Sequence, residues 1–335
     1  MEGRKKPSIS VIIPTYNRKS ELEQLLGSLA RQTLPAGSFE VIVVDDGSAD
    51  GTGAWLSAHM HSFGFSLSWY AQVRGGPGAA RNLGMEKAAG EIFAFTDTDC
   101  LPQPGWLERL IIPFGLGTVG AVGGREIINE NDPLLMRCFH YLMTASLTTG
   151  GLRGKEGKRL ARFYPRTFNM AIARKAYEAT GGFRKMFHGE DIELSFRIRE
   201  AGFALMYEGS AEVYHRRRST VVQYAQQLFC MGKARVTLAR LHRGSLEPLH
   251  LLPALLVSFF VLLGVILPWL SCAPAVVLAC SAAAMLFLAL LGVDSALRLR
   301  ALSAFFIIPF LFILQQGAYG IGSLVSLIRP EKINS

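Results

Sequence analysis

The sequence predicts an α/β domain with a mostly parallel sheet, followed by transmembrane helices towards the carboxyl-terminal end. Between residues 8 and 95, short apolar stretches alternate with helical stretches, which is typical of βαβ units and a parallel sheet. Polar loops follow the apolar stretches, at the edge where open α/β sheets bind ligands. A helix that crosses a bilayer needs about 20 apolar residues. Three such runs contain no Asp, Glu, Lys or Arg: residues 251–270, 273–293 and 301–328.

The strands are predicted from apolar runs that end at polar or glycine-rich residues. The first run stops at Pro14 and the second at Asp45, while Gly75 opens a tight loop after the third. The fourth run is short and stops before Asp97. We expect strands at residues 8–13, 39–44, 67–72, 92–95, 121–128, 168–173 and 205–214.

Helices are expected between these strands. Ser20, with Glu23 three residues later, has the spacing of a capping box at the start of the first helix. Acids that follow His188 indicate the first turn of another helix, where the helix dipole favours negative charge. We expect helices at residues 20–31, 50–61, 79–88, 133–150, 174–180 and about 188–201, and a mobile glycine-rich loop at residues 150–158.

Asp97 and Asp99 are the most informative pair of residues. They follow a buried strand and stand one residue apart, so in an extended segment both face the same side. Two hard oxygen ligands suit Mg²⁺ or Mn²⁺, and such ions usually also hold substrate phosphates. Arg81, near the start of the helix after the glycine loop, adds a positive charge where a helix N-terminus favours phosphate. A solvated acidic turn before Pro102 is the alternative interpretation.

Basic residues gather just before the first apolar run. Seven of them, and no acids, occur between residues 213 and 246 of a chain with a net charge of +9. Basic residues beside a membrane attract anionic lipid by about 1 kcal/mol each, so membrane lipid is the expected partner and nucleic acid is not. The five cysteines have no metal-binding spacing and are expected to be reduced. With no signal peptide visible, residues 1–248 are expected in the cytoplasm.

Six short motifs stand in one order between residues 8 and 240. They are Val11-Ile-Ile-Pro-Thr-Tyr-Asn17, Val43-Val-Asp-Asp-Gly-Ser-Ala-Asp-Gly-Thr52, Gly78-Ala-Ala-Arg-Asn82, Thr96-Asp-Thr-Asp99, Gly181-Gly-Phe183 and Gly189-Glu-Asp191. Each motif is weak alone, but the ordered set resembles the inverting family-2 glycosyltransferases, which have a GT-A fold. The resemblance implies a nucleotide-sugar donor, with a UDP-sugar favoured and a GDP-sugar next.

The resemblance also assigns the donor-binding residues. Pro14, Tyr16 and Asp46 occupy positions that bind the base in this family, and Asp46 is expected to accept a hydrogen bond from it. Arg81 stands where a cation meets the diphosphate. Asp97 falls where the family binds ribose and metal.

The metal and catalytic residues follow in the same way. Asp99 falls where the family holds a divalent metal, Mg²⁺ or Mn²⁺, together with Asp97. His215 is a further candidate ligand, and an exposed histidine in a basic run is the equal alternative. Asp191 matches the general base of direct displacement, and Glu190 is expected to position the acceptor or support Asp191.

Two departures from the family's patterns bear on the acceptor. Residues 226–230 lack the Arg-Trp pair of processive members, and residues 97–101 read Asp-Thr-Asp-Cys-Leu instead of the Asp-Ala-Asp-Leu-Gln common in polyprenyl-phosphate mannosyl- and glucosyltransferases. Both favour an enzyme of exopolysaccharide or lipid-linked glycan synthesis that adds one sugar. A polyprenyl-phosphate glycosyltransferase, a nucleotidyltransferase and a non-catalytic membrane subunit are the alternatives. Asn169 is expected to line the acceptor side and His188 to lie on the surface.

The expected domain organisation is a catalytic domain that a basic linker joins to a membrane region. The enzyme would then be a multi-pass inner-membrane protein that acts on a lipid-linked or glycan acceptor at the cytoplasmic face. Arg298 and Arg300, between the second and third spans, agree with this orientation. The third span is also open to interpretation as a kinked or re-entrant segment. The expected boundaries are 1–215 for the catalytic domain, 216–248 for an interfacial helical linker, 249–328 for helices at 249–270, 273–293 and 301–328, and 329–335 for the tail.

Overall fold

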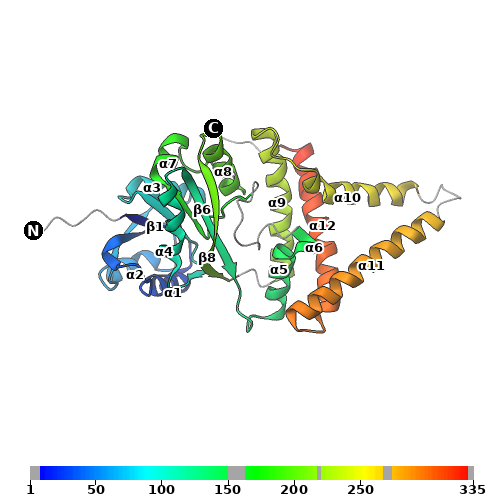
Figure 1. Ribbon diagram of the computed structural model, residues 1–335, viewed down its shortest axis with the longest axis horizontal. Helices are drawn as coiled ribbons and strands as arrows, with labels where there is room; N and C mark the ends of the chain where they lie inside the picture. Colours follow the sequence, from blue (N-terminus) through cyan, green and yellow to red (C-terminus); the bar gives the residue numbers. More distant parts are fainter. Residues whose placement is uncertain (1–7, 150–162, 187, 217–219, 267–273, 331–335) are drawn as a thin grey trace, which may run out of the picture.

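The structure is a computed structural model that describes residues 8–149, 163–186, 188–216, 220–266 and 274–330. An α/β domain formed by the first part of the chain packs against a group of long helices formed by the last part (Figure 1). The loop expected at residues 150–158 lies outside the described residues.

One eight-stranded sheet, in the order β3-β2-β1-β4-β7-β6-β8-β5, forms the centre of the domain. β1 to β4 are parallel, and so is the pair β6 and β8, whereas β7 runs antiparallel to both of its neighbours and β5 runs antiparallel to β8. The mostly parallel α/β sheet that the sequence predicts is therefore confirmed. The strands are β1 (Ile9–Thr15), β2 (Phe39–Asp45), β3 (Ser66–Ala71), β4 (Ile92–Phe95), β5 (Cys100–Pro102), β6 (Val119–Ile127), β7 (Met170–Ala173) and β8 (Ala204–His215).

Helices cover both faces of this sheet because side chains alternate between the two faces of each strand. In β1, Val11 packs with the cluster of α1, α2 and α4, whereas Ile12 packs with α3, α7 and α8 on the other face. The helices are α1 (Lys19–Leu29), α2 (Thr52–His59), α3 (Pro77–Lys87), α4 (Trp106–Ile111), α7 (Arg174–Thr180) and α8 (Glu190–Glu200), with short 3-10 turns η1 (Ala36–Ser38) and η2 (Ile112–Leu116).

Several local expectations are wrong. Ser20 does not cap α1, which begins at Lys19; the Lys19 amide instead donates to Asp50 Oδ2 at 3.0 Å, a contact that sequence spacing cannot indicate. The helix expected at residues 133–150 divides into α5 (Leu134–Thr144) and α6 (Ser146–Thr149) because Ala145 is extended. Helix α4 and the three-residue strand β5 were not expected from the sequence at all.

The second part of the chain contains α9 (Val221–Leu241), α10 (Pro248–Ile266), α11 (Pro274–Leu299) and α12 (Ala304–Ile328). α9 and α12 lie side by side, and α10 and α11 extend away from the sheet (Figure 1). Glycines allow the close approach: a Cβ at Gly232 would meet the backbone oxygen of Tyr319, and one at Gly322 would meet that of Phe229. Small residues have the same role at helix contacts inside membranes.

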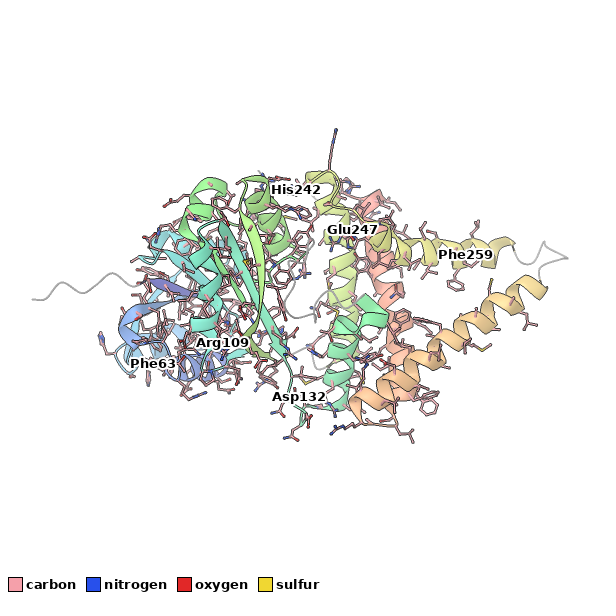
Figure 2. All side chains as sticks on the ribbon, viewed as in Figure 1. Phe63, Arg109, Asp132, His242, Glu247 and Phe259 are labelled. Atoms are coloured by element: carbon pink, nitrogen blue, oxygen red, sulfur yellow. The ribbon has the colours of Figure 1, made fainter. Side chains whose placement is uncertain are left out.

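Among the described residues, two helices are long and apolar enough to cross a membrane: Leu278–Leu299 and Ala304–Ile328. The apolar part of α10 is shorter, Pro248–Leu262, and carries exposed side chains such as Phe259 (Figure 2). The predicted span 249–270 ends in residues that are not described. Helix α11 continues through Arg298 to Leu299, beyond the end of the predicted span 273–293.

Candidate active site

A cleft of about 840 Å³ lies between the polar strand ends of the sheet and helices α9 and α12. Loops after β1, β2 and β4, the start of α8 and the end of β8 supply one wall. Tyr319 and residues of α9 supply the other. The residues expected to bind the donor, hold the metal or act in catalysis all line it, namely Pro14, Tyr16, Asp46, Arg81, Asp97, Asp99, Glu190, Asp191 and His215.

Arg81 links two of the acids at the centre of the cleft. Its Nη2 donates to Asp97 Oδ1 at 2.6 Å, and its Nη1 lies 3.3 Å from Glu190 Oε1. The guanidinium is only 3% exposed and belongs to α3, whose N-terminal turn follows the glycine loop. A buried cation is stable there because it is paired on both sides. The sequence placed Arg81 at the diphosphate, and the structure adds that it joins the end of strand β4 to the start of helix α8.

Asp99 lies among groups that fit a divalent cation. Atoms of Asp99, Cys100 and His215 lie within 4.8 Å of one another. Burial, followed by the charge of Asp99, raises the pKa of the Cys100 thiol well above its usual range. Mn²⁺ accepts both the carboxylate of Asp99 and the imidazole of His215 as ligand types.

His215 is held as a metal-ligating histidine would be. Its Nδ1 lies 3.0 Å from Glu126 Oε1, while its Nε2 lies 3.6 Å from Asp99 Oδ1. A carboxylate behind a ligating histidine fixes the ring and its tautomer. β5 and β8 produce this arrangement because they pair Cys100 with His215. The residues present fit a divalent cation.

Asp191 and Glu190 open helix α8 in different surroundings. Asp191 Oδ2 lies 3.4 Å from Arg166 Nη1, and its Oδ1 accepts the Ile192 amide at 2.8 Å. Burial, followed by the charge of Asp191, raises the pKa of Glu190, against the opposing charge of Arg81. The sequence did not indicate which of the two acids has the raised pKa.

The residues expected at the base also stand in the cleft. Asp46 accepts hydrogen bonds from the Gly75 and Gly76 amides at 2.7 and 2.9 Å. Gln72 Nε2 donates to the same carboxylate at 2.7 Å, so Asp46 holds the glycine loop as well as facing the cleft. The ring of Tyr16 is covered by Arg74, whose Cζ lies 4.2 Å from the ring centroid.

Two lesser expectations are wrong. Asn169 does not line the cleft: it is 1% exposed, donates to the backbone oxygens of Arg125 and Ala211, and accepts from Trp106 Nε1 at 2.8 Å. It thus bridges the irregularity where the register of β6 and β8 shifts. His188, expected on the surface, lines the cleft.

Sequence reasoning missed the arginine partners of the acids and the far wall. Arg18 donates to Asp99 Oδ2 at 2.8 Å, and Arg166 lies beside Asp191. Arg18 directly follows the polar loop after β1, and this position could have indicated a place in the cleft. Arg166 stands outside any motif, so no local pattern indicated it. Gln227 and Arg235 come from α9, which the sequence indicated only as an interfacial helix.

Comparisons with known proteins decide the family. The sequence profile named glycosyl transferase family 2 matches residues 10–181, which is half of the chain. The chain belongs to glycosyl transferase family 2. It is therefore a glycosyltransferase, as the sequence motifs indicate, and its sheet has the GT-A fold.

Individual relatives agree with this assignment. Glycosyltransferase AglE from Haloferax volcanii is 29% identical over 243 residues, which are 72% of this chain and 77% of that protein. Pre-mycofactocin glycosyltransferase from Mycobacterium tuberculosis is 30% identical over 254 residues, 72% of this chain and 49% of that protein. The chain therefore spans about half the length of the second relative.

A solved structure has a similar fold. The mannosyltransferase PcManGT from Pyrobaculum calidifontis, in complex with GDP-Man and Mn²⁺, superimposes with a TM-score of 0.68. The superposition covers 98% of this chain and 89% of the other, at 21% sequence identity. The two proteins therefore share their fold over the long helices as well as over the residues that the family profile matches.

Proposed function

We propose that this glycosyltransferase moves one sugar, with inversion, from a nucleotide-sugar donor to a lipid-linked or glycan acceptor at the cytoplasmic face of the membrane. The observation that carries the proposal is the single cleft that contains Asp97, Asp99, Glu190 and Asp191 beside helices α9 and α12. These acids thus face a wall formed by helix α9 and by Tyr319 of the apolar helix α12.

The donor would lie along the strand ends β1, β2 and β4. Tyr16 and Asp46 offer a ring and a carboxylate for the base, and Arg81 lies beside Asp97 for the diphosphate. PcManGT binds GDP-Man with Mn²⁺, which supports a nucleotide-sugar donor and a divalent ion here. Asp99, Asp97 and His215 would hold that ion, and a bound Mg²⁺ or Mn²⁺ would offset the negative charge of the leaving nucleoside diphosphate.

Asp191 would accept the proton of the attacking hydroxyl. Inversion by direct displacement needs one base on the face opposite the leaving group. The carboxylate stands at the start of α8, where Arg166 and the Ile192 amide orient it. Glu190, whose pKa is raised, would remain bound to Arg81 and keep Asp191 in place.

The membrane location rests on the helices α10 to α12. Two of them are long and apolar enough to cross a bilayer, and the basic stretch of α9 would face anionic lipid. In this arrangement the cleft would open towards the lipid headgroups. The protein would be a multi-pass inner-membrane protein whose catalytic domain lies in the cytoplasm.

The test is a donor screen on the full chain in neutral detergent. UDP- and GDP-sugars are incubated with Mn²⁺ or Mg²⁺, with and without a lipid-linked acceptor mixture, and nucleoside diphosphate release is measured. We expect one donor to be consumed in a metal-dependent way. Formation of nucleoside triphosphate and sugar 1-phosphate when pyrophosphate is added, which is the reverse reaction of a nucleotidyltransferase, would overturn the proposal. Equal transfer by the domain without its helices to a water-soluble acceptor would also overturn it.

A further inference from the structure

Helix α9 presents two adjacent rows of side chains with different partners. Residues four apart lie on one face of a helix. The first row, Tyr224, Leu228 and Gly232, is buried against α12; Tyr224 donates from its hydroxyl to Gln315 Oε1 at 2.6 Å. This row fixes how α9 is rotated about its axis.

The second row faces the cleft. It runs Gln223, Gln227, Met231 and Arg235, and all four line the cavity. The row thus offers two amides, one apolar side chain and one cation over three helical turns. Such a row is suited to a ligand that is polar at one end and anionic at the other.

Arg235 lies at the end of this row nearest the catalytic helix. The preceding residue, Ala234, and Leu238 are the closest neighbours of a Cβ built at Gly189. Gly189 directly precedes Glu190 and Asp191. The guanidinium therefore lines the cleft beside the start of α8.

The Arg235 guanidinium has one unsatisfied donor among the described residues. Its Nη1 is buried and has no hydrogen-bond partner within the part of the chain that the structure describes. The four acids proposed for the metal and for catalysis already have other arginines: Arg81 for Asp97 and Glu190, Arg18 for Asp99, and Arg166 for Asp191. A buried unsatisfied donor destabilises a protein, so an acceptor group from a ligand would offset that penalty.

We propose that Arg235 binds a phosphate group of the acceptor substrate, and that Gln223, Gln227 and Met231 carry the adjoining part of that acceptor. The guanidinium fork matches phosphate oxygens, which a single amide or hydroxyl does not. Arg235 would place the phosphate so that the neighbouring sugar hydroxyl reaches Asp191. This assignment rests on the proposed function and narrows its acceptor to a phosphate ester, borne either by a lipid or by a water-soluble sugar.

The test measures phosphate-dependent binding by calorimetry, with the full chain in neutral detergent micelles. Dodecyl phosphate is the lipid probe, dodecyl glucoside its uncharged counterpart, and glucose 1-phosphate the water-soluble probe. We expect dodecyl phosphate to bind more tightly than dodecyl glucoside, and Arg235→Gln to weaken it about tenfold or more. Arg235→Lys, which keeps the charge without the fork, should recover part of the affinity.

Arg243→Gln is the matched control, because Arg243 is exposed at the end of the same basic stretch and outside the cleft. Loss of affinity for both phosphate probes in Arg235→Gln supports phosphate recognition from either source, and loss for dodecyl phosphate alone assigns it to a lipid. Unchanged affinity in Arg235→Gln, or an equal loss in Arg243→Gln, overturns the proposal. A wild-type chain that binds no sugar nucleotide would refute the proposed function and leave these binding results standing.

Discussion

Arg81 Nη2 lies 2.6 Å from Asp97 Oδ1, in the middle of the cleft. Because the same guanidinium also contacts Glu190, one side chain joins the metal side of the cleft to the helix that carries the proposed base. The three residues belong to α3, the loop after β4 and α8, which meet only in the folded domain. Arg81 is thus a structural link as well as a donor-binding candidate.

Replacing Arg81 should destabilise the domain because it leaves two carboxylates facing each other without their cation. We expect Arg81→Gln to lower the free energy of unfolding by about 3 kcal/mol, seen as a lower unfolding temperature in detergent. Adding Glu190→Gln should restore part of the loss, since one of the stranded charges is then gone. Arg109→Gln, at an exposed site on α4 (Figure 2), should change stability by less than about 0.5 kcal/mol. Additive losses in the double variant would contradict the link.

The raised pKa of Glu190 predicts a pH dependence of stability. At pH values between the ordinary pKa of 4.5 and the raised pKa of the folded chain, Glu190 is more protonated in the folded chain than in the unfolded chain. Stability should therefore fall as the pH rises through that window. In Glu190→Gln this contribution should disappear, which unfolding temperatures measured from pH 4 to pH 8 would reveal. A Glu190→Gln profile parallel to that of the wild type would exclude Glu190 as its source.

Asp191 should be needed for transfer but not for donor binding. Asp191→Asn keeps the shape and an oxygen that can accept the Ile192 amide, but it removes the base. We expect a loss of turnover of at least about a hundredfold, with the donor affinity within about twofold of wild type. Transfer assays and calorimetry on the same preparation check both parts. Normal turnover in this variant would assign the proton transfer to another group.

The arrangement around Asp99 predicts graded effects on metal affinity. Asp99→Ala and His215→Ala remove ligands, and Glu126→Gln weakens the hold on the His215 ring. We expect the first two to lower Mn²⁺ affinity most and Glu126→Gln to lower it about tenfold, measured by electron paramagnetic resonance without donor. Glu178→Gln, an exposed acid on α7, is the control. Equal affinity in all four variants would place the ion elsewhere.

The sheet edge was predictable because its signals are local. Asp97 and Asp99 follow an apolar run, and strand ends in a parallel sheet converge by topology alone. Asp191 lies almost 100 residues further on, and only the ordered motifs of the family connected it to that edge.

The other residues of the cleft depend on contacts that no local pattern records. Arg166 reaches Asp191 from an irregular segment, and Arg235 reaches the cleft only because α9 is rotated by its packing on α12. For Asn169 the sequence predicted a cleft residue, whereas the structure shows a buried one. It was expected to line the acceptor side, but the shift in register between β6 and β8 leaves backbone oxygens that its side-chain amide satisfies inside the domain.

Two glycines of α12 provide a matched test of the helix packing that forms the cleft wall. A Cβ at Gly322 would meet the backbone oxygen of Phe229, whereas one at Gly317 would meet nothing within 4 Å. Gly322→Ala should push α9 away and destabilise the chain by about 1–3 kcal/mol. Gly317→Ala should stabilise it by about 0.5–1 kcal/mol, since alanine is the better helix former. Thermal unfolding in detergent measures both, and equal effects would mean that α9 and α12 are not packed as described. Because the proposed acceptor row lies on α9, Gly322→Ala should also weaken dodecyl phosphate binding, whereas Gly317→Ala should not.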